Sequence, residues 1–308
     1  MTQNAATVLQ QYQMRKTRRQ KDEFIAFMKD AYPQLQLQEG GVIKSRNLIL
    51  GNVESAKIIF GAHYDTCARL PFPNLIAPKN FLVTFGYSLL ITLPFFLAVA
   101  VINTLLNFVT DNYWVHYWLS LAGFLLLFVG TFMAGRPNRH TANDNTSGVV
   151  ALMELYEQLT PAQRAQVALV FFDNEENGLL GSSVFRKRYG KALNSKLMVN
   201  IDCISDGDHL LVIANKAARK RYGTALQQAF AAAEGDSKQL HHEKAEWAMY
   251  PSDQQGFKHA VALAGMKKAR FVGYYLDRIH TDKDTAFDQQ NISLFAEGCR
   301  RLAEGLEN

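Results

Sequence analysis

The feature that most limits how this chain can fold is a block of 56 residues, 80–135, in which Asp111 is the only formally charged side chain. Within it, the 29 residues 81–109 and the 22 residues 113–134 carry no formal charge, and a polar turn at 110–112 separates them. Each run exceeds the roughly 20 residues that a helix needs to cross the hydrocarbon of a bilayer. We therefore expect a transmembrane helical hairpin at 81–134, in contact with lipid.

The sequence around this hairpin predicts its orientation. Aromatic side chains gather at one end of the second run, as they do at membrane interfaces: Trp114, Tyr117 and Trp118. Basic residues flank the hairpin and are absent from its turn: Arg69, Lys79, Arg136 and Arg139. Because positive charge favours the cytoplasmic side, we expect a protein with two spans whose soluble part is cytoplasmic. The alternative is an apolar hairpin packed on the soluble domain or on a second copy, which would need unusually large partner surfaces.

The remaining 252 residues have an ordinary soluble composition, since about 24% of them are charged. We expect residues 1–80 and 135–308 to form one discontinuous domain. Three cysteines without disulfide or metal-knuckle spacing suit a reducing compartment: Cys67, Cys203 and Cys299. The start of the chain lacks the apolar region of a signal peptide. Basic clusters at 15–19, 216–221 and 267–270 come without a nucleic-acid module, so we expect solvated faces or an anionic lipid surface and no nucleic-acid partner.

Short apolar runs typical of strands alternate along this soluble part with segments whose apolar residues recur at helical spacing. This alternation predicts an α/β fold. Strands are expected at 42–50, 56–60, 167–172, 196–201, 209–214 and 270–276. Helices are expected at 8–32, 149–159, 219–233 and 292–306, and a loop at 250–257 is expected to enter a short helix.

Two adjacent carboxylates, Glu175 and Glu176, follow the predicted buried strand 167–172 after only Asp173 and Asn174. In α/β sheets, sites form at the carboxyl ends of strands. Adjacent side chains point in different directions, so one glutamate could bind a metal while the other handles a proton. Taken alone, the pair is weak evidence, because adjacent glutamates near a helix start are usually a solvated helix terminus.

His63 and Asp65 end another predicted strand and alternate around Tyr64, so both can face one side of an extended segment. A carboxylate in that position can accept the second N–H of a metal-binding imidazole. The same types of side chain recur at three further predicted element ends: Asp144, Asp202 and His280. His140 is excluded, because nothing in the sequence orients it.

Five such positions converge on one crevice if the sheet is doubly wound. Two histidines and three carboxylates suit a pair of zinc ions with one bridging carboxylate, while the remaining acid stays unligated. Each position alone has an ordinary structural explanation, such as a helix cap or a solvated strand end. Their joint occurrence favours a metal centre.

The motifs GAHYDT, ANDNTSGVVALMEL, NEENGLLGS, NIDCIS and IHTDKDT occur in this order between residues 61 and 285. They resemble the motifs of the co-catalytic di-zinc aminopeptidases, a family that also includes glutamate-carboxypeptidase-like and glutaminyl-cyclase-like enzymes. The resemblance covers residues 56–285 without the hairpin. It implies a three-layer α/β/α zinc-peptidase fold with a mixed central sheet, two zinc ions per chain, and peptide substrates.

The resemblance also implies a role for each residue. Asp144 would bridge the metals, His63 and Asp202 would complete one zinc site, and Glu176 and His280 the other.

The remaining implied roles concern proton transfer and support. Glu175 would be the general base, taking a proton from a zinc-activated water and passing it to the leaving amine. Asp65 would lie behind His63, and Asp284 would support the His280 loop. Three tyrosines are equivalent candidates for an oxyanion donor: Tyr250, Tyr274 and Tyr275.

This sequence departs from the family in two places: the hairpin interrupts it, and SDQQGF at 252–257 replaces the usual SDH-type loop. Ten residues separate Ala134 from Asp144, at most about 35 Å, so the site should open near the membrane and act on peptides there. We expect a membrane-anchored di-zinc aminopeptidase. A glutaminyl-cyclase-like enzyme would keep fewer ligands, and a catalytically silent receptor or scaffold would lose ligands or the base.

Overall fold

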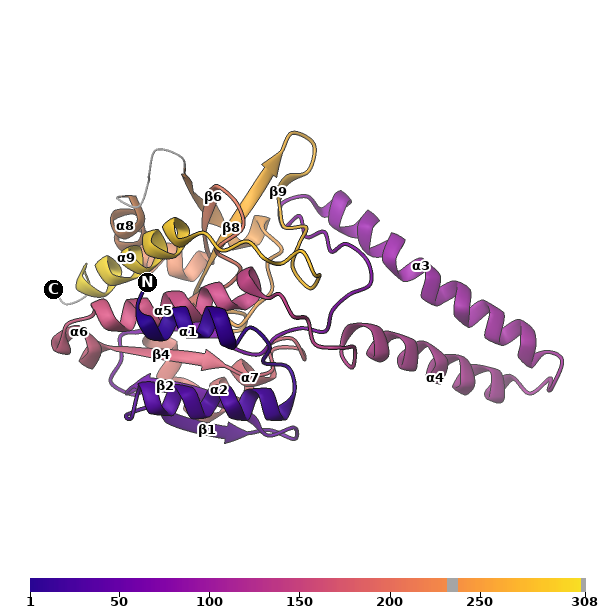
Figure 1. Ribbon diagram of the computed structural model, residues 1–308. Coiled ribbons are helices and arrows are strands. Elements are labelled where there is room, and N and C mark those ends of the chain that lie inside the picture. The colour runs from indigo at the N-terminus through magenta and orange to yellow at the C-terminus, as the bar shows by residue number, and fades with distance from the viewer. Residues whose placement is uncertain (232–237, 306–308) are drawn as a thin grey trace.

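A mixed nine-stranded sheet forms the centre of the computed structural model, which describes residues 1–231 and 238–305 (Figure 1). The strand order is β1-β2-β4-β3-β5-β8-β6-β7, and β9 pairs with β8. The strands are β1 Gln36–Gly40, β2 Ser45–Gly51, β3 Ile58–His63, β4 Val167–Phe172, β5 Leu197–Ile201, β6 His209–Ala214, β7 Gln239–Lys244, β8 His259–Ala269 and β9 Gly273–Tyr275.

The middle of this sheet is parallel. Strands β4, β3, β5 and β8 are neighbours that all run in one direction. β1 also runs this way, because it is antiparallel to β2, which is antiparallel to β4. β6 and β7 run the opposite way. We call the edge at which β3, β4 and β5 end (His63, Phe172 and Ile201) the C-terminal edge.

Helices and loops cover both faces of the sheet. The helices are α1 Gln3–Gln11, α2 Arg18–Ala31, α3 Phe81–Leu106, α4 Tyr113–Phe132, α5 Gly148–Gln158, α6 Pro161–Gln166, α7 Leu180–Tyr189, α8 Lys216–Ala231 and α9 Gln289–Gly305. Apolar residues of α1, α2, α5, α8 and α9 share one core with one face of the sheet. On the other face, α7 and the connecting loops cover two smaller cores. The predicted three-layer α/β/α architecture with a mixed sheet is therefore confirmed.

The buried apolar strands match the sequence predictions best. β4 and β6 have the predicted bounds, and every residue of β4 is buried, as expected of a central parallel strand. β1 and β7 were not predicted because they are polar strands at the sheet margins. β8 was also missed, because the alanine-rich start of this strand, HAVALAG, has weak β propensity. The loop at 250–257 leads into β8 and not into the predicted short helix.

Two further predictions need correction. The predicted helix 8–32 is two helices, because Thr17 starts α2 with a capping box and the chain turns at residues 12–17. The predicted strand 270–276 is a turn followed by the short β9. The last residues of the predicted helices 219–233 and 292–306 lie outside the described residues.

Helices α3 and α4 extend away from the sheet beside each other (Figure 1). They lie within the predicted runs 81–109 and 113–134, and Asn80 and Asn112 cap their first turns. Their rings contact each other at Phe96 and Phe124, with centroids 5.8 Å apart. Both helices are long and apolar enough to cross a membrane, on length and composition alone, and almost none of their residues is buried. The division into a hairpin insert and a discontinuous domain stays a prediction.

We expect Phe24→Ala to lower the free energy of unfolding by about 3–5 kcal/mol, because it removes a fully buried ring. Phe24 stacks on Tyr64 with centroids 5.3 Å apart. Chemical denaturation in mild detergent measures the change. The matched control is Phe271→Ala, whose ring is 84% exposed and should change stability by less than about 0.5 kcal/mol. Equal effects of the two variants would contradict this packing.

Candidate metal centre

The predicted ligands come from five separate segments and meet at the C-terminal edge of the sheet. His63 is the last residue of β3, and Asp202 directly follows β5. Glu176 lies in the loop after β4, Asp144 precedes α5, and His280 follows β9. The parallel direction of β3, β4 and β5 is what brings three of these segments to the same edge.

Asp144 lies between the two histidines. Its Oδ1 is 3.3 Å from Nε2 of His63, and its Oδ2 is 2.9 Å from Nε2 of His280. His63 Nε2 is also 3.5 Å from Oδ1 of Asp202, and His280 Nε2 is 3.3 Å from Oε2 of Glu176. The Asp144 carboxylate therefore presents one oxygen to each of two sets, and each set contains one histidine and one further carboxylate.

Asp65 holds the loop that carries the glutamate pair. Its Oδ1 accepts the backbone N–H of Glu175 at 2.9 Å, and its Oδ2 accepts that of Glu176 at 3.2 Å. The nearest contact of His63 Nδ1 in this segment is the backbone carbonyl of Asp65 at 3.0 Å, whereas the carboxylate lies at 3.7 Å. The resemblance implied that the Asp65 carboxylate supports the His63 imidazole. In this structure the carboxylate lies closer to the backbone of the Glu175 loop than to that imidazole.

Asp284 does the same for the Asp144 loop. Its two carboxylate oxygens accept the backbone N–H groups of Asn143 at 2.9 Å and Asp144 at 3.0 Å. Its own carbonyl accepts the N–H of Ala142 at 3.1 Å. Asp284 was expected to support the His280 loop. Its side-chain hydrogen bonds instead support the loop that carries Asp144.

The pKa shifts at the centre follow from crowded, buried carboxylates. Burial opposes protonation of His63, but the neighbouring carboxylates outweigh it and raise its pKa well above the usual value. The pKa of His280 is raised in the same way, chiefly by Glu176 and Asp144 against burial. Burial raises the pKa of the Glu175 carboxyl well above its usual range, and nearby acids add to this. A site of this kind has excess negative charge and favours a bound cation.

The donor atoms fit metal ions. Three groups of potential ligands have their donor atoms within 4.8 Å of one another: His63, Asp144 and Asp202; His63, Glu175 and Glu176; and Cys67, Glu176 and His280. Among the described residues, Oε1 of Glu176 and Oδ1 of Asp202 are buried without a hydrogen-bond partner. Buried carboxylate oxygens normally have partners, so these two atoms are suited to coordinate a cation. Imidazole and carboxylate donors are those that zinc accepts.

Several residues near the centre were not predicted. Arg15, expected on a solvated face, is fully buried; its side chain donates to the carbonyl of Tyr64 and to Thr146 Oγ1. Asp253 is also fully buried, and burial raises its pKa to about 7. The unusual loop 252–257 was the only sequence signal for Asp253. For Arg15 there was no signal, because it lies within a run of basic residues.

The tyrosines that were candidates for the oxyanion donor have different surroundings in the structure. The Tyr250 hydroxyl donates to the carbonyl of Asp202 at 3.1 Å. Tyr274 instead packs against the rings of His209 and His241, with centroids 5.5 and 5.2 Å away. His140, which was excluded, is exposed.

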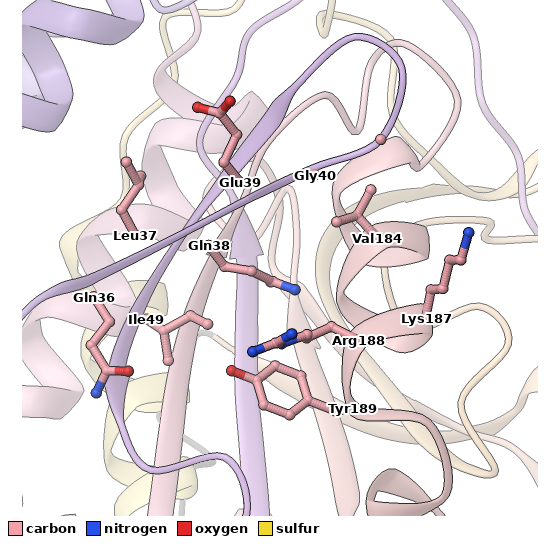
Figure 2. A pocket seen from close by; sticks show the side chains of 11 residues that line it. Gln36, Leu37, Gln38, Glu39, Gly40, Ile49, Val184, Lys187, Arg188 and Tyr189 are labelled. Carbon is pink, nitrogen blue, oxygen red and sulfur yellow. The ribbon is translucent and has the colours of Figure 1, made fainter.

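A pocket of about 640 Å³ lies between β1 and α7 (Figure 2). Val184, Lys187, Arg188 and Tyr189 of α7 face the polar residues of β1 across it. None of its lining residues is a predicted site residue.

Comparison with solved structures supports the fold. An aminopeptidase from Legionella pneumophila, LapA, is 12% identical with a TM-score of 0.56, and the match covers 99% of this chain and 68% of LapA. A second LapA structure matches with 12% identity and a TM-score of 0.53, over 99% of this chain and 71% of LapA. A zinc aminopeptidase from Bacillus subtilis is 15% identical, over 86% of this chain and 50% of its own, with a TM-score of 0.47.

Comparison with curated proteins finds no similar sequence. The family model described as Peptidase family M28 matches residues 129–302, which is more than half of the chain. Together with the aminopeptidase-like fold, this match bears out the resemblance drawn from the motifs. The protein therefore belongs to peptidase family M28 and is a hydrolase of the peptidase class.

Proposed function

We propose that this protein is a membrane-anchored aminopeptidase that uses two zinc ions, with Glu175 as its general base. The observation that carries the proposal is the placement of Asp144, whose two oxygens face His63 and His280 at 3.3 and 2.9 Å. A carboxylate in that position is suited to bridge two metals.

Each zinc would be held by Asp144 and two further residues. His63 and Asp202 would complete one site, and Glu176 and His280 the other. When bound, the two ions would supply Lewis acidity that lowers the pKa of water and polarises a peptide carbonyl.

Glu175 is well placed for proton transfer. Asp65 fixes the backbone N–H groups of Glu175 and Glu176 together, so the two side chains are directed differently from one rigid loop. Burial and the neighbouring acids raise the pKa of Glu175, which favours its uptake of a proton. In the proposed reaction, Glu175 removes a proton from the attacking water and delivers it to the amine as the peptide C–N bond breaks.

The membrane part of the proposal rests on α3 and α4, which we propose span the bilayer with both ends on the cytoplasmic side. Their bases contact the rest of the chain: the Tyr87 hydroxyl donates to the carbonyl of Pro73, and Lys16 Nζ to that of Met133. The hairpin is therefore held at both of its bases, by the segment that follows β3 and by the segment that precedes α2.

Glu175→Gln should reduce aminoacyl-anilide hydrolysis by roughly 10²–10⁴-fold, the usual contribution of a general base. Because Glu175 is proposed to lie outside the ligand set, zinc content should stay near that of wild type, as measured by elemental analysis. Glu54→Gln, on the surface, is the matched control and should keep full activity. Full activity of Glu175→Gln would refute the assigned role.

Asp144→Asn should lower the zinc content of the purified protein, because it weakens a ligand shared by both sites. It should also reduce the rise in melting temperature when zinc is added to chelator-treated protein, since only ligand binding to the folded state stabilises it. Differential scanning fluorimetry measures this rise. An unchanged zinc content and an unchanged rise would argue against a bridging role.

The proposed orientation predicts which side of the membrane each segment faces. All three native cysteines are buried, so a new surface cysteine can be labelled selectively. In sealed vesicles of known orientation, an impermeant maleimide should label Thr110→Cys only from the non-cytoplasmic side and Lys220→Cys only from the cytoplasmic side. Labelling of both from one side would exclude a hairpin that spans the membrane.

A further inference from the structure

We propose that the C-terminal edge of the sheet docks on the surface of an anionic lipid bilayer through two exposed turns. They are the β1–β2 turn, residues 41–44, and the β8–β9 turn, residues 270–272. This inference rests on the membrane anchoring proposed above, and it adds a second contact with the bilayer beside the two helices.

The β1–β2 turn lies at the C-terminal edge because β1 runs parallel to β4. Ser45, which directly follows the turn, accepts a hydrogen bond from Asn174 Nδ2 at 3.0 Å. Asn174 precedes Glu175, the proposed base. The turn therefore borders the loop that carries the glutamate pair.

The β8–β9 turn lies beside the start of α3. β8 runs parallel to β5 and continues past Leu263, the partner of the last β5 residue, to Ala269. The carbonyl of Phe271 accepts a hydrogen bond from Asn80 Nδ2 at 3.0 Å. Asn80 is the residue that caps α3. Figure 1 shows this turn close to the first turn of α3, where the chain would enter the bilayer.

Both turns expose apolar side chains next to basic ones. Val42 is 101% exposed, Ile43 51% and Phe271 84%. Lys44 follows the first pair, and Arg270 precedes Phe271; both basic residues are exposed. Apolar side chains that enter the headgroup region, together with lysine and arginine that attract anionic lipid, are the usual composition of a membrane-surface contact.

The basic clusters of the sequence are distributed unevenly about the sheet. Arg18 and Arg19 are exposed at the start of α2, close to Lys16, which contacts the end of α4 through Met133. The cluster 267–270 leads into the β8–β9 turn. Two of the three basic clusters therefore lie near the hairpin, as an anionic surface would require.

The third cluster, 216–221, lies elsewhere. It begins α8, which follows β6, and β6 ends opposite the start of β8 because the two strands are antiparallel. Residues of this cluster are therefore at the far edge of the sheet and provide a control surface.

Docking of the C-terminal edge would place the metal centre over the bilayer surface, where it would receive peptide ends held at that surface.

The test uses the full-length protein in nanodiscs of phosphatidylcholine with or without phosphatidylglycerol. An environment-sensitive fluorophore is attached to Val42→Cys, Phe271→Cys or the far-edge control Lys220→Cys. Leu93→Cys, in α3, reports on insertion of the hairpin. In anionic nanodiscs, labels at 42 and 271 should show blue-shifted emission and lose most of their fluorescence to spin-labelled lipids, while the label at 220 should stay water-like. Combining Lys268→Glu and Arg270→Glu with the label at 271 should weaken docking at least roughly fivefold.

The possible results separate the two proposals. Water-like emission at 42 and 271 with a lipid-quenched label at 93 would overturn docking and leave the membrane anchor intact; this is also the result expected if the turns instead bind a protein partner. Water-like emission at 93 as well would overturn both the anchor and the docking. Equal quenching at 42, 271 and 220 would also overturn docking, because contact would then lack the proposed orientation.

Discussion

The geometry of the candidate centre depends on one repeated interaction, a buried carboxylate that accepts two successive backbone N–H groups. Asp65 holds Glu175 and Glu176 in this way, and Asp284 holds Asn143 and Asp144. Two hydrogen bonds to the two oxygens of one carboxylate fix the orientation of a loop as well as its distance. The loop after β4 and the segment before α5 are thereby held in one arrangement, and they position the side chains that face the centre.

The carboxylates gathered at the centre carry negative charge, and buried cations partly offset it. Arg15 is fully buried and interacts electrostatically with Asp65 and Asp144. Lys21 pairs with Asp173 at 2.5 Å, directly before the glutamate loop. Both cations come from the first 21 residues of the chain. The N-terminal segment therefore contributes to the electrostatics of a site to which it supplies no proposed ligand. Removing one partner of such a buried pair is costly, because the other charge is left unpaired.

The sequence indicated the candidate ligands more clearly than the residues that hold their loops. His63, Asp202 and Glu176 were identifiable because each follows an apolar strand, and the ordered motifs gave the resemblance its specificity. The contact of Asp65 with Glu175 joins residues 110 positions apart, and no local pattern indicates it. Arg15 was misjudged for the same reason, since a basic run gives no sign that one member is buried. Among the strands, β4 was predicted from its continuous apolar run, whereas β8 is rich in alanine and has only one β-branched residue, Val261.

The position of the hairpin in the chain has a consequence for biosynthesis. α3 and α4 lie between His63 and the other four proposed ligands, Asp144, Glu176, Asp202 and His280. A ribosome that works from the N-terminus therefore releases one ligand first, then both apolar helices, and only then the rest. The centre cannot be completed until the helices have been made. If α3 and α4 span the membrane as proposed, the nascent chain would make its anchor before it could complete the centre, so the order of synthesis would place anchoring ahead of activity.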